Sequence, residues 1–204
     1  MKIFFHFSLS EYSNTYLIGP DDGGDAILID PGHIDLELIQ SIEENHYNIA
    51  YVLLTHRHAT HTLGLGTLMK IYKPIVYAGS STLYEYPVTT ILDHTALRLS
   101  GICVDAIQIP GHSIDSFIFC IGDALFTGDV LFAGRIGSTN GVLERALLLK
   151  GIKQRLFPLD ERIAVYPGHG AMSTLKIEKM FNHDLIDAMA MEDMAFLSHP
   201  SIIT

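Results

Sequence analysis

The sequence predicts an α/β protein in which two β-sheets pack against each other and helices cover both outer faces. Strand and helix patterns alternate along the chain, and helices are interleaved with strands in both halves. The 204 residues are 48% apolar and only 18% charged, which is ample material for a core. Several apolar runs end in histidine or aspartate beside a glycine turn, as strands do when their ends meet at one edge. Two packed sheets with helices outside are one of the few stable layered arrangements.

The first part of the chain predicts a β-meander, then a helix and a buried strand. A dense turn signal, Pro-Asp-Asp-Gly-Gly-Asp, occupies 20–25. Asp35 is a suitable cap or first-turn acid for the helix. The expected elements are strands at 2–7, 15–19 and 26–30, an amphipathic helix at 35–46, and a strand at 49–54.

The rest of the chain continues the alternation of helices and strands. Gly122-Asp123 predicts a hairpin turn and Asn140-Gly141 another turn. The expected elements are helices at 62–72, 142–157 and 174–196, a short helix or turn at 79–86, a β-rich segment at 87–105 that includes a strand at 96–99, and strands at 74–77, 106–109, 117–121, 124–127 and 163–166.

Two of these helices carry apolar residues that predict core-facing surfaces. In the helix at 142–157 they are Val142, Leu143, Ala146, Leu147, Leu149 and Leu156. In the helix at 174–196 they are Met180, Leu185, Met189 and Met191. A methionine-rich face is more often part of a core than of a cofactor pocket.

Three histidines follow the buried strand at 49–54. They are His56, His58 and His61 in the segment Thr-His-Arg-His-Ala-Thr-His. In extended backbone the first two side chains lie on one face, and the third suits the first turn of a helix. Neutral imidazole is the commonest protein ligand for zinc and similar metals. Alone, the segment is also compatible with a solvated histidine-rich loop.

Three further strand ends favour the metal interpretation. The strand at 106–109 leads to His112, the strand at 124–127 to Asp129, and the strand at 163–166 to His169, each through a glycine. We therefore predict a metal site at the edge where the two sheets meet. Its expected ligands are His56, His58, His61, His112, Asp129 and His169.

The remaining histidines and cysteines have plainer interpretations. We expect ordinary surface or partly buried histidines at His6, His33, His46, His183 and His199, although His33 follows a Pro-Gly turn and is a weak candidate for a place near the site. Asp93-His94 is a minor candidate for another metal site. Cys103 and Cys120 both lie in apolar runs, which predicts buried free thiols.

Composition restricts the partners. A net charge of −10 argues against nucleic acid and against an anionic membrane surface. The sequence contains no signal peptide and no stretch of membrane-spanning length. We expect one domain over 1–204, in a cytoplasmic protein with a small-molecule substrate, as a monomer or homodimer.

The motifs together resemble the metallo-β-lactamase superfamily, in particular its short glyoxalase II-like branch of hydroxyacylglutathione hydrolase-like proteins. They span nearly the whole chain: Asn14-Thr15-Tyr16-Leu17, Leu28-Ile29-Asp30-Pro31-Gly32, the His-x-His-x-x-His of 56–61, Pro110-Gly111-His112-Ser113, Thr127-Gly128-Asp129 and Pro167-Gly168-His169-Gly170. The resemblance implies an αββα sandwich. It also implies one or two zinc ions, with iron or manganese as alternatives.

By the same resemblance, the six ligands divide between two metal positions. The first position would be held by His56, His58 and His112. The second would be held by His61 and His169, with Asp129 bridging the two.

The chain departs from the family pattern at two places. Thr60 stands where the family has an aspartate that binds the second metal. A neutral hydroxyl leaves more cationic charge uncompensated than a carboxylate does, so we expect a full first site and a weakened or empty second one. In the segment 134–140, relatives usually have serine and arginine in the opposite order and aspartate at Asn140.

Three functions remain open at this point. The first is hydrolysis of a thioester or ester by metal-activated water, with Thr60 and Asp129 as candidate catalytic residues. The second is a persulfide dioxygenase-like reaction at a single iron held by His56, His112 and Asp129. The third is a metal-binding interaction protein with weakened catalysis.

Overall fold

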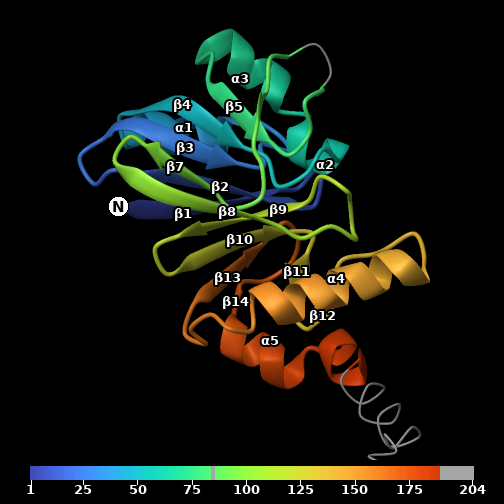
Figure 1. Ribbon diagram of the computed structural model, residues 1–204. Coiled ribbons are helices and arrows are strands. Elements are labelled where there is room, and N and C mark those ends of the chain that lie inside the picture. Colours follow the sequence, from blue (N-terminus) through green and yellow to red (C-terminus); the bar gives the residue numbers. More distant parts are fainter. Residues whose placement is uncertain (84–85, 189–204) are drawn as a thin grey trace, which may run out of the picture.

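The computed structural model describes residues 1–83 and 86–188 as two mixed β-sheets packed face to face, with helices on both outer sides (Figure 1). The first sheet has the strand order β1-β2-β3-β4-β5-β6 and the second β14-β13-β10-β9-β8-β7. The predicted four-layer αββα sandwich is therefore confirmed. A separate hairpin of β11 and β12 lies beside the second sheet.

The first sheet begins with the expected meander. Strands β1, β2 and β3 are antiparallel, and the next strands join in parallel. Asp35 caps α1 by accepting a hydrogen bond from Leu38 N. The bounds are β1 Lys2–Ser8, β2 Ser13–Gly19, β3 Gly24–Ile29, α1 Leu36–Glu44, β4 Tyr47–Leu53, α2 Ala59–Thr62, α3 Leu65–Ile71, β5 Ile75–Ala78 and β6 Thr89–Thr90.

The second sheet and its helices follow. Its strands are antiparallel except that β10 and β13 run parallel, and β9 and β10 form the expected hairpin. The bounds are β7 Thr95–Leu99, β8 Ile102–Gln108, β9 Phe117–Ile121, β10 Ala124–Gly128, β11 Leu131–Phe132, β12 Arg135–Ile136, α4 Val142–Arg155, β13 Ala164–Pro167, β14 Ser173–Thr174 and α5 Leu175–Phe181.

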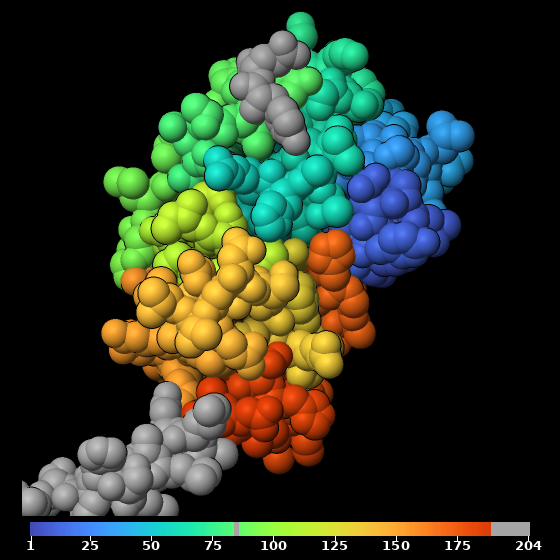
Figure 2. Space-filling view, turned by 90° about the vertical axis from the view of Figure 1, so that its right-hand side faces the viewer, coloured from blue at the N-terminus to red at the C-terminus, as the bar shows by residue number. Residues whose placement is uncertain are grey.

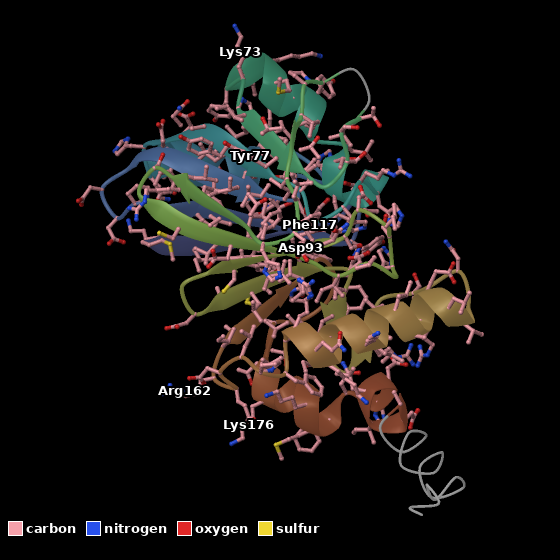
Figure 3. All side chains as sticks on the ribbon, viewed as in Figure 1. Lys73, Tyr77, Asp93, Phe117, Arg162 and Lys176 are labelled. Carbon is pink, nitrogen blue, oxygen red and sulfur yellow. The ribbon has the colours of Figure 1, made fainter. Side chains whose placement is uncertain are left out.

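Three apolar clusters correspond to the three interfaces between the four layers. The central cluster lies between the sheets and includes Tyr16, Phe119 and Phe126. Phe117 belongs to it and lies in the middle of the molecule (Figure 3). A second cluster joins the first sheet to α1 and α3, and a third joins the second sheet to α4 and α5. The sheets are thus fixed against each other, and so are the positions of their edges.

Several predicted elements differ in detail. The helix expected at 62–72 begins later, as α3 at Leu65, and a separate short helix, α2, ends at Thr62; Gly64, a poor helix former, lies between them. In the segment 79–86, where a short helix or a turn was expected, the described residues have bends, a bridge between Leu83 and Tyr86 and a hydrogen bond from Tyr86 N to Leu83 O, which agrees with the turn. The last helix breaks at Asn182, and its predicted continuation, with Met189 and Met191, lies outside the described residues.

The predicted core face of α4 is wrong for its first half. Val142 is 84% exposed and Leu143 77%. Ala146 and Leu147 are also exposed, so the helix packs through Leu148, Ile152 and Leu156 instead. Leu149 lies partly buried against the same cluster. The apolar residues surround much of this helix, so their spacing does not identify the buried stripe.

Three further expectations about burial are corrected. Cys103 is exposed and Cys120 only half-buried, because the outward-facing positions of β8 and β9 carry them. Met180 is 54% exposed, whereas Leu185 is buried as expected.

Among the described residues, no helix is both long and apolar enough to cross a membrane.

Candidate metal centre

The predicted ligands all lie at one edge of the sandwich, where the two sheets meet. The segment after β4 carries three of them, and the loops after β8, β10 and β13 carry the others. This edge is at the right of Figure 1 and faces the viewer in Figure 2, where segments far apart in the sequence meet. The structure thus brings together His56, His58, His61, His112, Asp129 and His169.

The first group of donors consists of His56, His58, His112 and Asp129. His58 Nδ1 lies 2.9 Å from His56 Nε2 and 3.0 Å from His112 Nε2. Asp129 Oδ2 lies 3.7 Å from His56 Nε2 and 3.5 Å from His112 Nε2. Two donors held by one tetrahedral zinc at ~2.0–2.1 Å are roughly 3.4 Å apart, so this spacing suits one metal ion.

The second group consists of His61, Asp129 and His169. His61 Nε2 lies 3.3 Å from Asp129 Oδ1, and His169 Nε2 lies 3.7 Å from Asp129 Oδ2. Asp129 therefore belongs to both groups. This group has three donor side chains where the first has four.

Outer contacts fix which nitrogen of each ring faces the centre. His112 Nδ1 donates to Ser138 O at 2.8 Å, and His169 Nδ1 donates to Tyr12 O at 2.6 Å. A carbonyl oxygen only accepts, so both Nδ1 atoms carry the proton and both Nε2 atoms have free lone pairs. Partners of this kind are what hold metal-binding histidines in one tautomer.

On the side of the first sheet, Asp30 and Thr55 hold the rings of His56 and His61 in place in a similar way. Thr55 donates its hydroxyl to Asp30 Oδ2 at 2.7 Å, which leaves Thr55 Oγ1 to accept from His56 Nδ1 at 3.1 Å. Asp30 also accepts from Thr55 N at 2.8 Å and lies 3.2 Å from His61 Nδ1. One buried carboxylate therefore positions two of the ligand histidines.

The centre contains buried polar atoms without hydrogen-bond partners among the described residues. His61 Nε2 and Asp129 Oδ1 are both of this kind and face each other. Buried polar atoms in folded proteins are nearly always paired. A cation beside these two atoms would satisfy both, which is an independent indication that the cluster fits a metal.

The electrostatics favour the metal-binding protonation states of His56 and Asp129, and they draw positive charge to His61. Burial, together with the neighbouring His61, lowers the pKa of His56 to about 2, so its imidazole is neutral. Burial would raise the pKa of Asp129, but the close contact with His61 and the positive charge of that ring lower it below its usual range. Burial likewise opposes protonation of His61, yet Asp30 and Asp129 raise its pKa to about 10. The two carboxylates thus attract positive charge to this position.

Gly168 is needed for the close packing of side chains at the centre. A Cβ on Gly168 would lie 2.5 Å from Asp129 Oδ1 and 2.7 Å from His61 Cε1. Glycine at this position lets the loop after β13 pass directly against the donors.

Thr60 lies half-buried in α2, and its carbonyl accepts a hydrogen bond from Ser13 Oγ at 2.8 Å. This contact holds the short helix that carries His61 against β2. A threonine at this position adds no negative charge to the second group. The donors there include one carboxylate, that of Asp129.

Within residues 1–83 and 86–188, the other candidate residues are not part of the centre. His33 is exposed, as expected for a surface histidine. Asp93 is paired with Arg155 through two hydrogen bonds of 2.7 and 2.6 Å and belongs to neither donor group. His199 lies outside the described residues.

Asp30 was missed as a site residue by reasoning from the sequence alone. A signal was present, because it ends the apolar strand β3 just as Asp129 follows β10. Ser138 and Tyr12 were also missed. They act through backbone carbonyls, which any residue has, so the sequence carries no signal for them.

Two hollows open beside the donors. One of about 790 Å³ is lined by His112, Asp129, His169, Arg135 and other residues of the segments 132–145 and 183–187. The other, of about 440 Å³, is lined by Arg57, His58, His112, Ile114 and Leu147 among others. The candidate centre therefore opens onto hollows on two sides.

A sandwich of two sheets with histidines and aspartate gathered at one edge defines a class of metal-dependent enzymes. The chain belongs to the metallo-beta-lactamase superfamily, whose family model matches residues 10–169. This confirms the resemblance drawn from the motifs.

Individual relatives agree with this assignment. The hydroxyacylglutathione hydrolase GloC of Haemophilus influenzae is 31% identical over 79% of this chain and 88% of its own length. The crystal structure of ETHE1 from Myxococcus xanthus matches with a TM-score of 0.79 and 27% identity over 93% of this chain and 90% of that one. The structure of TTHA1623 in a di-iron-bound form matches with a TM-score of 0.74 and 26% identity over 88% and 98%.

Proposed function

We propose that the protein is a metal-dependent hydrolase that cleaves a thioester or a related ester. The observation that carries this proposal is the convergence of five histidines and Asp129 from both sheets. The likeness to a hydroxyacylglutathione hydrolase supports a thioester over other bonds. Superfamily membership supports a hydrolase in general.

The two metal positions have unequal sets of donors. His56, His58, His112 and Asp129 would hold the first ion. His61, Asp129 and His169 would hold the second more weakly, because Thr60 supplies a dipole in place of a charge. Zinc suits the histidine-rich donor set best, and iron or manganese would fit the same ligands.

The reaction consumes one water and releases a carboxylic acid and a thiol: a C–O bond forms at the carbonyl carbon and the C–S bond breaks. A bound divalent metal supplies Lewis acidity, which acidifies water and polarises a carbonyl oxygen. Asp129, between the two donor groups, can accept a hydrogen bond from the attacking water and so orient it. Asp30 and Thr55 hold His56 in position, which keeps the donor geometry fixed.

A metal count combined with an activity assay tests this proposal. Protein purified without chelator should hold about one tightly bound ion per chain, and it should hydrolyse simple thioesters until a chelator removes the metal. Two tightly held ions would contradict the weakened second position. Absence of metal, or thioester hydrolysis that a chelator leaves unchanged, would contradict the function itself.

A second function is supported by the arrangement of three donors. His56, His112 and Asp129 form a two-histidine, one-carboxylate set, which is the ligand preference of non-haem iron. The structural likeness to ETHE1 agrees with this alternative. Bound iron and oxygen uptake with glutathione persulfide would favour it over hydrolysis, whereas zinc without oxygen uptake would eliminate it.

A further inference from the structure

The smaller hollow beside the metal centre has an apolar wall that the donor set does not use. His58 and His112 line this hollow from the side of the centre, and Ile114 and Leu147 line it from the loop after β8 and from α4. Ile114 is 74% exposed and Leu147 is 52% exposed. Large apolar side chains that share an exposed hollow are typical of a binding surface. The metal donors and this apolar wall therefore open onto the same space.

The exposed apolar face of α4 is confined to the half of the helix that borders the hollow. At helical spacing, one exposed stripe runs through Leu143, Leu147, Lys150 and Gln154. The first two positions are leucines, and the last two are polar. Val142 lies beside the first of them and is 84% exposed. Because a stripe that only faces water is normally polar throughout, the leucines near the donors indicate a ligand.

The helix that carries Leu147 is held directly against a donor loop. A Cβ on Gly111, the residue before His112, would lie 2.6 Å from Glu144 O and 2.6 Å from Leu148 Cβ. Leu148 is fully buried against the second sheet. The distance between this part of α4 and the metal donors is therefore set by the fold.

Ile114 is likewise held in place by its backbone. It lies in a closed turn, in which Ser113 N donates to Ser116 Oγ at 3.2 Å and Ser116 N donates to Ser113 O at 3.3 Å. The carbonyl of Ile114 accepts from Gln108 Nε2 at 3.1 Å. The turn thus presents the side chain outward before any ligand arrives, and a wall formed in advance lowers the cost of binding.

The two hollows differ in their chemistry. Charged residues line much of the larger one, namely Arg135, Arg145, Asp184 and Asp187. Arg57 and Glu144 are the charged residues of the smaller one, and both are exposed, so their charges can stay in water. The aliphatic part of the Arg57 side chain can also lie along an apolar ligand. Because His112 lines both hollows, a substrate at the centre can extend an apolar group into the smaller one.

We propose that the smaller hollow is the acyl subsite, and that the substrate class is thioesters of aliphatic acids several carbons long. This inference rests on the proposed hydrolase function. Ile114 and Leu147 would determine specificity, because each methylene group that they cover is removed from water. The volume of about 440 Å³ lies within the range of ~300–1,000 Å³ that is usual for small-molecule sites.

A series of thioesters that differ only in the acyl chain tests the proposal. The metal-loaded protein is assayed with acetyl, butyryl and hexanoyl thioesters of N-acetylcysteamine. Each added methylene should raise kcat/KM by about 2- to 4-fold, so the hexanoyl thioester should exceed the acetyl thioester by at least about 10-fold. In the double variant Ile114→Ser/Leu147→Ser this ratio should fall to about 3-fold or less.

The double variant Leu92→Ser/Ile71→Ser is the matched control. Leu92 is 73% exposed in a loop and Ile71 is 54% exposed at the end of α3, and both lie outside the two hollows. The control should keep the dependence on chain length. Equal rates along the series for the wild-type protein would overturn the proposal, and so would a ratio that the Ile114→Ser/Leu147→Ser variant keeps or that both double variants lose equally.

Failure of hydrolysis would be a separate result. If no thioester is cleaved, calorimetric titration of the metal-loaded protein with acetohydroxamate, butyrohydroxamate and hexanohydroxamate still tests the subsite. Affinity that rises with chain length, is lost in Ile114→Ser/Leu147→Ser and is kept in the control would support the subsite and contradict only the hydrolase function. Equal affinities, or no binding of any of the three, would contradict the acyl subsite as well.

Discussion

Asp129 is the residue on which the centre depends most. It belongs to both donor groups, and its two oxygens face four different histidines. Asp30 lies on the other side of the His61 ring, with Oδ2 3.2 Å from His61 Nδ1. The remaining donors are imidazoles, which supply no negative charge, so the charge that can hold two divalent ions is small. Thr60 is the position at which one more carboxylate would change this balance.

Thr60→Asp should therefore strengthen the second metal position. Its carboxylate adds a full negative charge beside His61, so the number of tightly held ions should rise from about one to about two per chain. The measurement is metal content after dialysis against a weak chelator, with thioester hydrolysis measured alongside.

Thr60→Asn is the control for this change, because it alters the size of the side chain without adding charge. It should leave metal content as it is. If Thr60→Asp binds no more metal than Thr60→Asn, the charge argument for the second position fails.

At the scale of elements, α4 shows why periodicity alone is a limited guide. Apolar residues lie on several sides of this helix, and those of its first half are exposed near the smaller hollow. Its packing depends on Leu148 and Ile152, which are fully buried against the second sheet.

Leu148→Ala should thus destabilise the protein by ~2–5 kcal/mol, since it creates a cavity under the helix. Leu143→Ala, at a residue that is 77% exposed, should change stability by less than about 0.5 kcal/mol. Urea unfolding of the two variants measures the difference. Equal losses of stability would mean that the helix packs through another face.

The end of α4 is tied to the second sheet by Arg155 and Asp93. Burial alone would raise the pKa of Asp93, but hydrogen bonds from Arg155 and from Gln108 N lower it. Because the pKa of Asp93 is lower in the folded protein than in the unfolded chain, the pair stabilises the protein at pH values above the unfolded pKa of about 3.9. That stabilisation is lost as the pH falls through the folded value.

Arg155→Gln should accordingly cost roughly 0.5–1 kcal/mol at pH 7, because the pair is only partly shielded from solvent. The difference from the wild-type protein should shrink when unfolding is measured near pH ~3. Arg162→Gln, which removes an exposed local pair with Asp160, should have little effect at either pH. A difference that persists undiminished at the lower pH would contradict a role for the Asp93 charge.

At the scale of the whole molecule, the sequence predicts well the layers and the edge at which the candidate ligands gather, and it predicts the surfaces poorly. Strand ends at His112, Asp129 and His169 are local signals, and a sheet pair can place them together in few ways. The exposed half of α4, the exposed Cys103 and the backbone carbonyl partners depend on packing between distant segments. No local pattern encodes those contacts.

The most direct test of the account is X-ray diffraction from crystals of the protein, with anomalous data collected at the absorption edge of the bound metal. We expect a strong anomalous peak within bonding distance of His56, His58, His112 and Asp129. We expect a weaker peak, or none, between His61 and His169. A strong peak elsewhere, or four first-position donors that contact no metal in a crystal of active protein, would contradict it.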